Sequence, residues 1–205
     1  MNIYFVRHGE TEFNHTHRHQ PDDAPLNDLG RSQAEKVREE VLALKPTHFI
    51  TSTHSRAVET ASIINEAGEY ELEYNELFRE LERPERIQGK KHFGVPSLFY
   101  IYQWFIGFRD TYWERNGGES HKAFIDRIKA AKEYLETLPE DATVVIVSHS
   151  VFINFFIEHV CREHMLSTKE AFDLLMKITD LPNTAITHVS YNPDFGDGVC
   201  KWSVL

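Results

Sequence analysis

The sequence predicts an α/β fold, a three-layer α/β/α sandwich around a mostly parallel sheet with an antiparallel edge. Short apolar runs at residues 3–6, 48–51 and 143–147 are rich in β-branched and aromatic residues, which is typical of buried strands. Helical patterns alternate with these runs along the chain. Such alternation places helices on both faces of a parallel sheet.

Local signals mark each element in the first half of the chain. Apolar residues at helical spacing predict a helix over residues 34–44, which Pro46 ends. A second amphipathic helix follows the strand at 48–51 and ends at Gly68. Residues 70–74 then predict a short strand.

The segment 84–116 has poor periodicity, and we expect it to form a lid-like insertion. Ser120 is placed to cap the next helix, whose apolar stripe ends before Pro139. With no internal repeat and no Gly/Ser-rich linker, residues 1–205 are expected to form a single domain. A chain of this length can bury a sizeable core.

The strongest strand signal lies at residues 143–147, which are apolar almost throughout, as a central parallel strand requires. A buried helix is expected at 151–160. Residues 167–170 have a capping-box pattern that predicts another helix. Two last strands, at 185–191 and 199–205, are joined by turn residues and form the antiparallel edge.

The charge of the chain limits its partners. The formal net charge is −10, with 22 Lys and Arg against 32 Asp and Glu. This balance argues against nucleic acid and anionic membranes as partners, because both favour a basic surface. An anionic substrate would need a local cationic site.

Cysteine content and hydropathy indicate a cytoplasmic protein. Cys161 and Cys200 are the only cysteines, and we expect both to be reduced thiols. The amino terminus has no secretory signal pattern. The uncharged stretch at 93–108 is shorter than the roughly 20 residues of a membrane span.

Chemistry-bearing residues follow the predicted strands. Residues 7–11 read Arg-His-Gly-Glu-Thr after the first strand, and Arg56 lies in a segment that follows the second. Ser-His-Ser at 148–150 follows the strongest strand, and Glu80 lies in the sequence Phe-Arg-Glu-Leu. Ligands of open α/β sheets bind at the carboxyl ends of the strands.

These segments closely resemble the motifs of the histidine phosphatase superfamily, branch 1, which is phosphoglycerate mutase-like. Residues 26–34, 118–120 and 182–185 also match family patterns in the same order. The resemblance implies the sandwich fold described above. It also implies a phosphoric monoester hydrolase, in which residues 182–184 are structural or form a distant wall of the site and are not catalytic.

The resemblance assigns a role to each of five catalytic residues. His8 is the nucleophile, which forms a phosphohistidine intermediate. Arg7 and Arg56 bind the phosphoryl oxygens through permanent charges. His149 stabilises charge in the transition state, and Glu80 is the general acid and then the general base.

Four further residues are expected to bind the substrate. They follow or precede the catalytic histidines in the sequence. They are Thr11, Asn14, Ser148 and Ser150. For the acidic role, Glu76 and Glu82 are the neighbouring alternatives to Glu80.

Three histidines alternate in the loop after the first motif. If the loop is extended, His15, His17 and His19 share one face and could bind a transition metal. They could instead form a wall for the substrate or be exposed to solvent. The proposed chemistry needs no metal and no cofactor.

The sequence departs from the family after Glu80, where many members have Trp-Glu-Gly. The aromatic segment 93–113 occupies the region of the lid in relatives. These aromatics could be core, an apolar cap over the substrate, or a homodimer interface. Nearby basic residues could contact a second acidic group of the substrate. These are Arg83, Arg86, Lys90 and Lys91.

The sequence therefore predicts a metal-independent phosphatase that acts on a small phosphorylated metabolite through His8. A cofactor-dependent phosphoglycerate mutase is the alternative, since related sequences divide between the two activities. A non-catalytic module that binds a phosphorylated ligand is a third reading.

Overall fold

The computed structural model of the chain describes residues 1–105, 116–161, 170, 174, 181–195 and 199–205. Its six strands form one sheet in the order β3-β2-β4-β1-β5-β6. They are β1 (Asn2–Arg7), β2 (His48–Thr51), β3 (Leu72–Tyr74), β4 (Thr143–Ser148), β5 (Ile186–Tyr191) and β6 (Trp202–Val204). The first four pair in parallel, and β5 and β6 form the antiparallel edge. The predicted fold class is confirmed.

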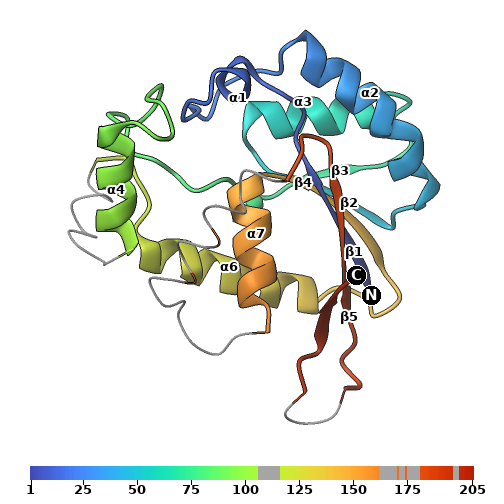
Figure 1. The fold of residues 1–205 in the computed structure, drawn as a ribbon. Coiled ribbons are helices and arrows are strands. Elements are labelled where there is room, and N and C mark those ends of the chain that lie inside the picture. Colours follow the sequence, from blue (N-terminus) through green and yellow to red (C-terminus); the bar gives the residue numbers. More distant parts are fainter. Residues whose placement is uncertain (106–115, 162–169, 171–173, 175–180, 196–198) are drawn as a thin grey trace.

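Helices cover both faces of the sheet (Figure 1). On one face lie α2 (Asp28–Ala43) and α3 (Ser55–Ile64), and on the other lie α6 (His121–Glu136) and α7 (Ser150–His159). The short helices are α1 (Glu12–His15) and η1 (Glu76–Phe78), and α4 (Val95–Phe105) lies apart from the sheet.

Side chains of the central strands alternate between the two layers. Phe5 and Ile146 pack under α6 and α7, whereas Val6 and Val147 pack under α2 and α3. All four are fully buried. A strand covered on both faces has no polar side, which explains the continuous apolar run of β4.

Strand register brings three functional segments to one edge of the sheet. Arg7 pairs with Ser148, and Thr51 pairs with Val147. Two backbone bonds continue the pattern past the strands. The N–H of His8 donates to the Ser148 carbonyl at 3.0 Å, and that of Ser52 to the Val147 carbonyl at 2.9 Å. The chain segments after β1, β2 and β4 therefore begin side by side.

The predicted insertion contains a helix that the sequence pattern did not indicate. Helix α4 is apolar almost all round, so it has no clear helical stripe. Tyr100 and Trp104 face inward, and Trp104 donates its indole N–H to the Glu119 carbonyl at 3.0 Å. Several large apolar residues are exposed here. They are Phe93, Val95, Leu98, Phe99 and Tyr102. The segment therefore contributes both to the core and to the surface.

Some sequence predictions concern residues that the structure does not describe. Most of the helix predicted after 167–170 lies outside the described residues, as do residues 106–113 of the aromatic segment. Within the described ranges, no helix is long and apolar enough to cross a membrane.

The expectation of two reduced thiols is wrong for this structure. Cys161, after α7, and Cys200, before β6, form a disulfide with their Cα atoms 5.4 Å apart. The fold brings together two segments that are 39 positions apart. A sequence with only two cysteines does not reveal this proximity.

We expect this disulfide to stabilise the native state by up to about 4 kcal/mol, because it closes a long loop in the unfolded chain. Replacing both Cys161 and Cys200 by Ala should lower the free energy of unfolding, measured by urea titration without reductant. Dithiothreitol should destabilise the wild type and leave the double variant unchanged. Equal stability of both proteins without reductant would contradict the bond.

Candidate active site

His8 lies just beyond β1, and its imidazole is oriented by a backbone carbonyl. Its side chain is buried, and the Nδ1–H donates to the Gly9 carbonyl at 2.7 Å. A carbonyl only accepts, so the proton is on Nδ1 and Nε2 keeps its lone pair. Burial, together with Arg56 and Arg7, holds the pKa of His8 well below its usual value. His8 is therefore a neutral imidazole at pH 7.

The turn after His8 is fixed by close backbone packing. The Gly9 N–H donates to the Thr60 hydroxyl at 3.0 Å, and the Asn183 amide donates to the His8 carbonyl at 2.9 Å. A Cβ on Gly9 would overlap the backbone carbonyl of Gly30. Only glycine permits this approach, which sets the position of His8.

Arg56 is a buried cation with only part of its guanidinium engaged. It lies in the first turn of α3, where Nη1 donates to the Pro21 carbonyl at 3.0 Å and Nη2 to His54 Nδ1 at 3.1 Å. Among the described residues, no acceptor reaches its Nε. Burial lowers the pKa of Arg56 to about 10, opposed by Glu80, so it stays charged at pH 7.

Arg7, the last residue of β1, also has a guanidinium that is only partly engaged. Its Nη1 donates to the Leu181 carbonyl, while its buried Nε has no partner in the described part of the chain. Burial lowers the pKa of Arg7, and Glu80 and Glu10 act against this. Arg56 is buried and Arg7 is partly buried, and the unsatisfied donors of their guanidiniums are suited to an anion with several oxygens.

His149 follows β4, and its ring centroid lies 5.1 Å from that of His8. Its Nε2 is 2.7 Å from the Ser52 hydroxyl, and its buried Nδ1 has no partner among the residues described. Burial, Arg56 and His54 hold the pKa of His149 well below the usual value. The unpartnered Nδ1 adds a third open hydrogen-bonding position beside the two arginines.

The carboxylate of Glu80 is held at the start of α7. One oxygen accepts from the N–H groups of Leu81, at 2.9 Å, and Phe152, at 3.2 Å. The other accepts from Val151 at 3.2 Å. Since α7 begins directly after His149, these bonds fix Glu80 next to that residue.

A partly buried ion pair holds the backbone that leads to Glu80. Arg127 pairs with Glu119 through Nε and Nη2, at 2.9 and 2.8 Å. The same guanidinium donates to the carbonyls of Leu77, Arg79 and Glu80. Sequence reasoning gave Arg127 no role, although Glu119 was within a recognised motif.

Three of the four predicted substrate-binding residues use their side chains in hydrogen bonds within the protein. Thr11 caps α1 by accepting from the Asn14 N–H at 3.2 Å, and the Asn14 side chain accepts from the Thr11 N–H. Ser148 donates to the Phe78 carbonyl at 2.8 Å. Ser150 is the first residue of α7. Substrate contacts of these four residues remain a prediction.

The three alternating histidines do not share one face. His15 and His17 are exposed, whereas His19 is buried with its ring 4.6 Å from that of His92. The segment is not extended, because α1 ends at His15 and His17 has φ 53°. In the described ranges, no three His, Cys, Asp or Glu side chains gather as a metal site would require.

The structure also brings in Ser52 and His54, for which sequence reasoning gave no role. Both precede Arg56 in the motif after β2, and both are buried. Their signal was polar side chains at the carboxyl end of an apolar strand, the same position that drew attention to His8 and His149.

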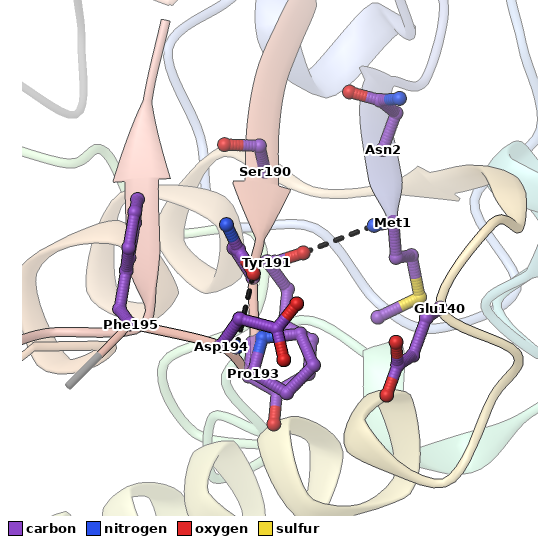
Figure 2. Close-up of a pocket in the computed structure, with 9 residues that line it drawn as sticks. Met1, Asn2, Glu140, Ser190, Tyr191, Pro193, Asp194 and Phe195 are labelled. Carbon is purple, nitrogen blue, oxygen red and sulfur yellow. Dashed lines mark hydrogen bonds between the residues drawn. The ribbon is translucent and has the colours of Figure 1, made fainter. Parts of the chain in front are cut away.

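A separate pocket lies at the opposite end of the sheet (Figure 2). It is lined by the start of β1 and the segment after β5, including Met1, Tyr191 and Phe195. None of the predicted site residues lines it, and the carboxylates of Glu140 and Asp194 would repel a phosphate.

Comparison with known proteins agrees with this geometry. The histidine phosphatase superfamily (branch 1) matches residues 3–199. The chain belongs to this superfamily. A relative from Escherichia coli, named "Probable phosphoglycerate mutase GpmB", is 30% identical over 172 residues, which are 78% of this chain and 74% of the relative. The five predicted catalytic residues all lie within the superfamily match.

Solved structures of other proteins have a fold similar to that of this superfamily member. A phosphoserine phosphatase from Entamoeba histolytica has a TM-score of 0.74 and 21% identity, covering 99% of this chain and 94% of that one. A mycobacterial glucosyl-3-phosphoglycerate phosphatase has a TM-score of 0.72 and 23% identity, covering 100% and 96%. At such identities the similarity concerns the fold.

The buried histidines should make the stability of this superfamily member depend on pH. Burial lowers the pKa of His19 to about 2 and of His54 to about 3, and those of His8 and His149 also fall. In the unfolded chain they titrate near about 6.5. The free energy of unfolding is therefore highest above that pH. It decreases as the pH falls, because the unfolded chain takes up protons that the buried histidines cannot, by about 2 kcal/mol per histidine at pH 5.

Urea unfolding at pH 7 and pH 5 measures this loss. His19→Gln should reduce the difference between the two pH values by about 2 kcal/mol, because it removes one titrating group. His15→Gln, at an exposed position, should leave the difference as in wild type. If His19→Gln lost as much stability between pH 7 and pH 5 as the wild type, protonation of His19 would not explain the pH dependence.

Proposed function

We propose that the chain is a phosphatase that hydrolyses a small phosphorylated metabolite through a phosphohistidine on His8. The observation that carries this proposal is the neutral His8 with a free Nε2, close to Arg56 and Arg7, whose guanidiniums have unsatisfied donors. Superfamily membership supports the same reaction class.

In the first step, the Nε2 lone pair of His8 attacks phosphorus and the bond from phosphorus to the ester oxygen breaks. The leaving oxygen takes a proton from Glu80, which must enter this step in its protonated form and acts as the general acid. Arg7, Arg56 and His149 bind the phosphoryl oxygens as the transition state forms. The product alcohol departs and phosphohistidine remains.

In the second step, Glu80 as a carboxylate takes a proton from water while the water oxygen attacks phosphorus. The phosphorus–nitrogen bond breaks, which releases inorganic phosphate and restores neutral His8. Glu80 regains the proton that it gave in the first step. The reaction balances without a metal or a redox cofactor.

The depth of the site supports a small substrate. His8 and Arg56 are each 2% exposed, so the phosphoryl group must enter a buried position. Relatives of the same fold carry the names of phosphatases for small metabolites, glucosyl-3-phosphoglycerate and phosphoserine. The relative named as a phosphoglycerate mutase makes that activity the second candidate.

His8→Ala should abolish turnover, by at least about a thousandfold in kcat, because it removes the proposed nucleophile. Phosphate release from p-nitrophenyl phosphate and a panel of phosphometabolites measures this, with and without EDTA. Wild type should be resistant to EDTA. Trapping of a phosphoenzyme on His8→Ala would refute the nucleophile. Phosphate exchange from 3-phosphoglycerate with its bisphosphate primer, without net hydrolysis, would instead identify a mutase.

Glu80→Gln should slow the hydrolysis of alkyl phosphates by roughly 100-fold and that of aryl phosphates much less, because an aryl oxide leaves without protonation. The readout is kcat/KM across leaving groups of different pKa. Glu82→Gln is the matched control, since Glu82 is paired with Arg79 at 2.8 Å and should keep the wild-type dependence. Equal slowing of all esters in Glu80→Gln would rule out the acid role.

A further inference from the structure

A third buried imidazole lies beside the two histidines of the candidate site. His54 is 4% exposed, and its ring centroid lies 5.0 Å from that of His149. It occupies the N-cap position of α3, but its side chain makes no capping bond. Formation of the helix therefore does not account for a histidine here.

The contact with Arg56 determines which nitrogen of His54 carries the proton. A guanidinium only donates, so His54 Nδ1 must accept from Arg56 Nη2 across their 3.1 Å contact. The proton of the neutral ring is then on Nε2. That atom lies 3.4 Å from Oδ1 of Asp22 and makes no hydrogen bond within the described residues, so the carboxylate acts on it only through its charge.

Electrostatics favour this neutral form. Burial and the nearby Arg56 lower the pKa of His54 to about 3. A protonated ring would present an N–H to the guanidinium and lose the bond. The backbone supports the same arrangement, because the Ser55 N–H donates to the Asp22 carbonyl at 3.2 Å.

The result is an arginine held from two sides. The Pro21 carbonyl accepts from Nη1, and His54 accepts from Nη2. These acceptors occupy two of the five N–H groups of Arg56 and leave its buried Nε–H available. A side chain that is already ordered loses less conformational entropy when it binds an anion.

We propose that His54 is a positioning residue, which accepts from Arg56 and holds its guanidinium in the orientation that binds the phosphoryl group. The proton of His54 is on Nε2 because Nδ1 accepts from Arg56. The inference rests on the proposed function, in which Arg56 binds phosphate. It adds a residue that acts through that arginine and does not touch the reacting atoms.

Two substitutions separate hydrogen bonding from packing. His54→Asn keeps an acceptor near the position of Nδ1, whereas His54→Leu fills space without an acceptor. Thr53→Ala is the matched control, because Thr53 is the exposed neighbour in the same loop. Thermal unfolding of each variant reports whether it is folded. Calorimetric titration with inorganic phosphate and with orthovanadate reports the affinity of the site without requiring turnover.

We expect His54→Leu to lower the affinity for both anions by roughly tenfold, the usual scale for losing a hydrogen bond to a charged group. His54→Asn should stay within about threefold of wild type, and Thr53→Ala should match it. In an Arg56→Gln background, His54→Leu should have no further effect, since its action depends on Arg56. This coupling is absent if the leucine only disturbs packing.

Wild-type affinity in folded His54→Leu would overturn the inference, as would additive losses with Arg56→Gln. A loss in His54→Asn as large as in His54→Leu would also overturn it. If wild type binds phosphate but hydrolyses no ester, the proposed function fails while the test of His54 stands. If wild type binds neither anion, both fail.

Discussion

The parallel pairing of β4 with both β1 and β2 is the constraint on which the site depends. Their register makes three strands end at one edge of the sheet, so that His8, Ser52 and His149 begin adjacent segments. Helices α3 and α7 start at that edge and cover opposite faces. Arg56 therefore enters from one layer, and the amides that hold Glu80 enter from the other.

The electrostatics of the site oppose those of the whole chain. A protein with a net charge of −10 buries Arg56 and partly buries Arg7, where less water can screen their charges. Their cost of burial is offset in part by Glu80, which raises the pKa of both. Burial and the two arginine charges also keep His8 neutral, so that a nucleophile is available close to two cations.

Sequence patterns predicted the sheet and the site edge well, because β1, β2 and β4 are apolar runs that end in polar residues. They could not predict contacts that arise only from three-dimensional folding. The disulfide joins Cys161 to Cys200 across 39 positions, and Arg127 reaches the backbone near Glu80 from α6. Helix α4 was missed because a helix that is apolar nearly all round lacks the periodicity that marks amphipathic ones.

The contact between the turn at Gly9 and the start of α2 limits how this sequence can change. A methyl group on Gly9 would overlap the carbonyl of Gly30, and one on Gly30 would overlap the carbonyl of Glu10. Both obstacles are main-chain atoms, so no shortening of another side chain could make room. The two glycines thus form a pair without single-step replacements, and variation of this protein must proceed around them.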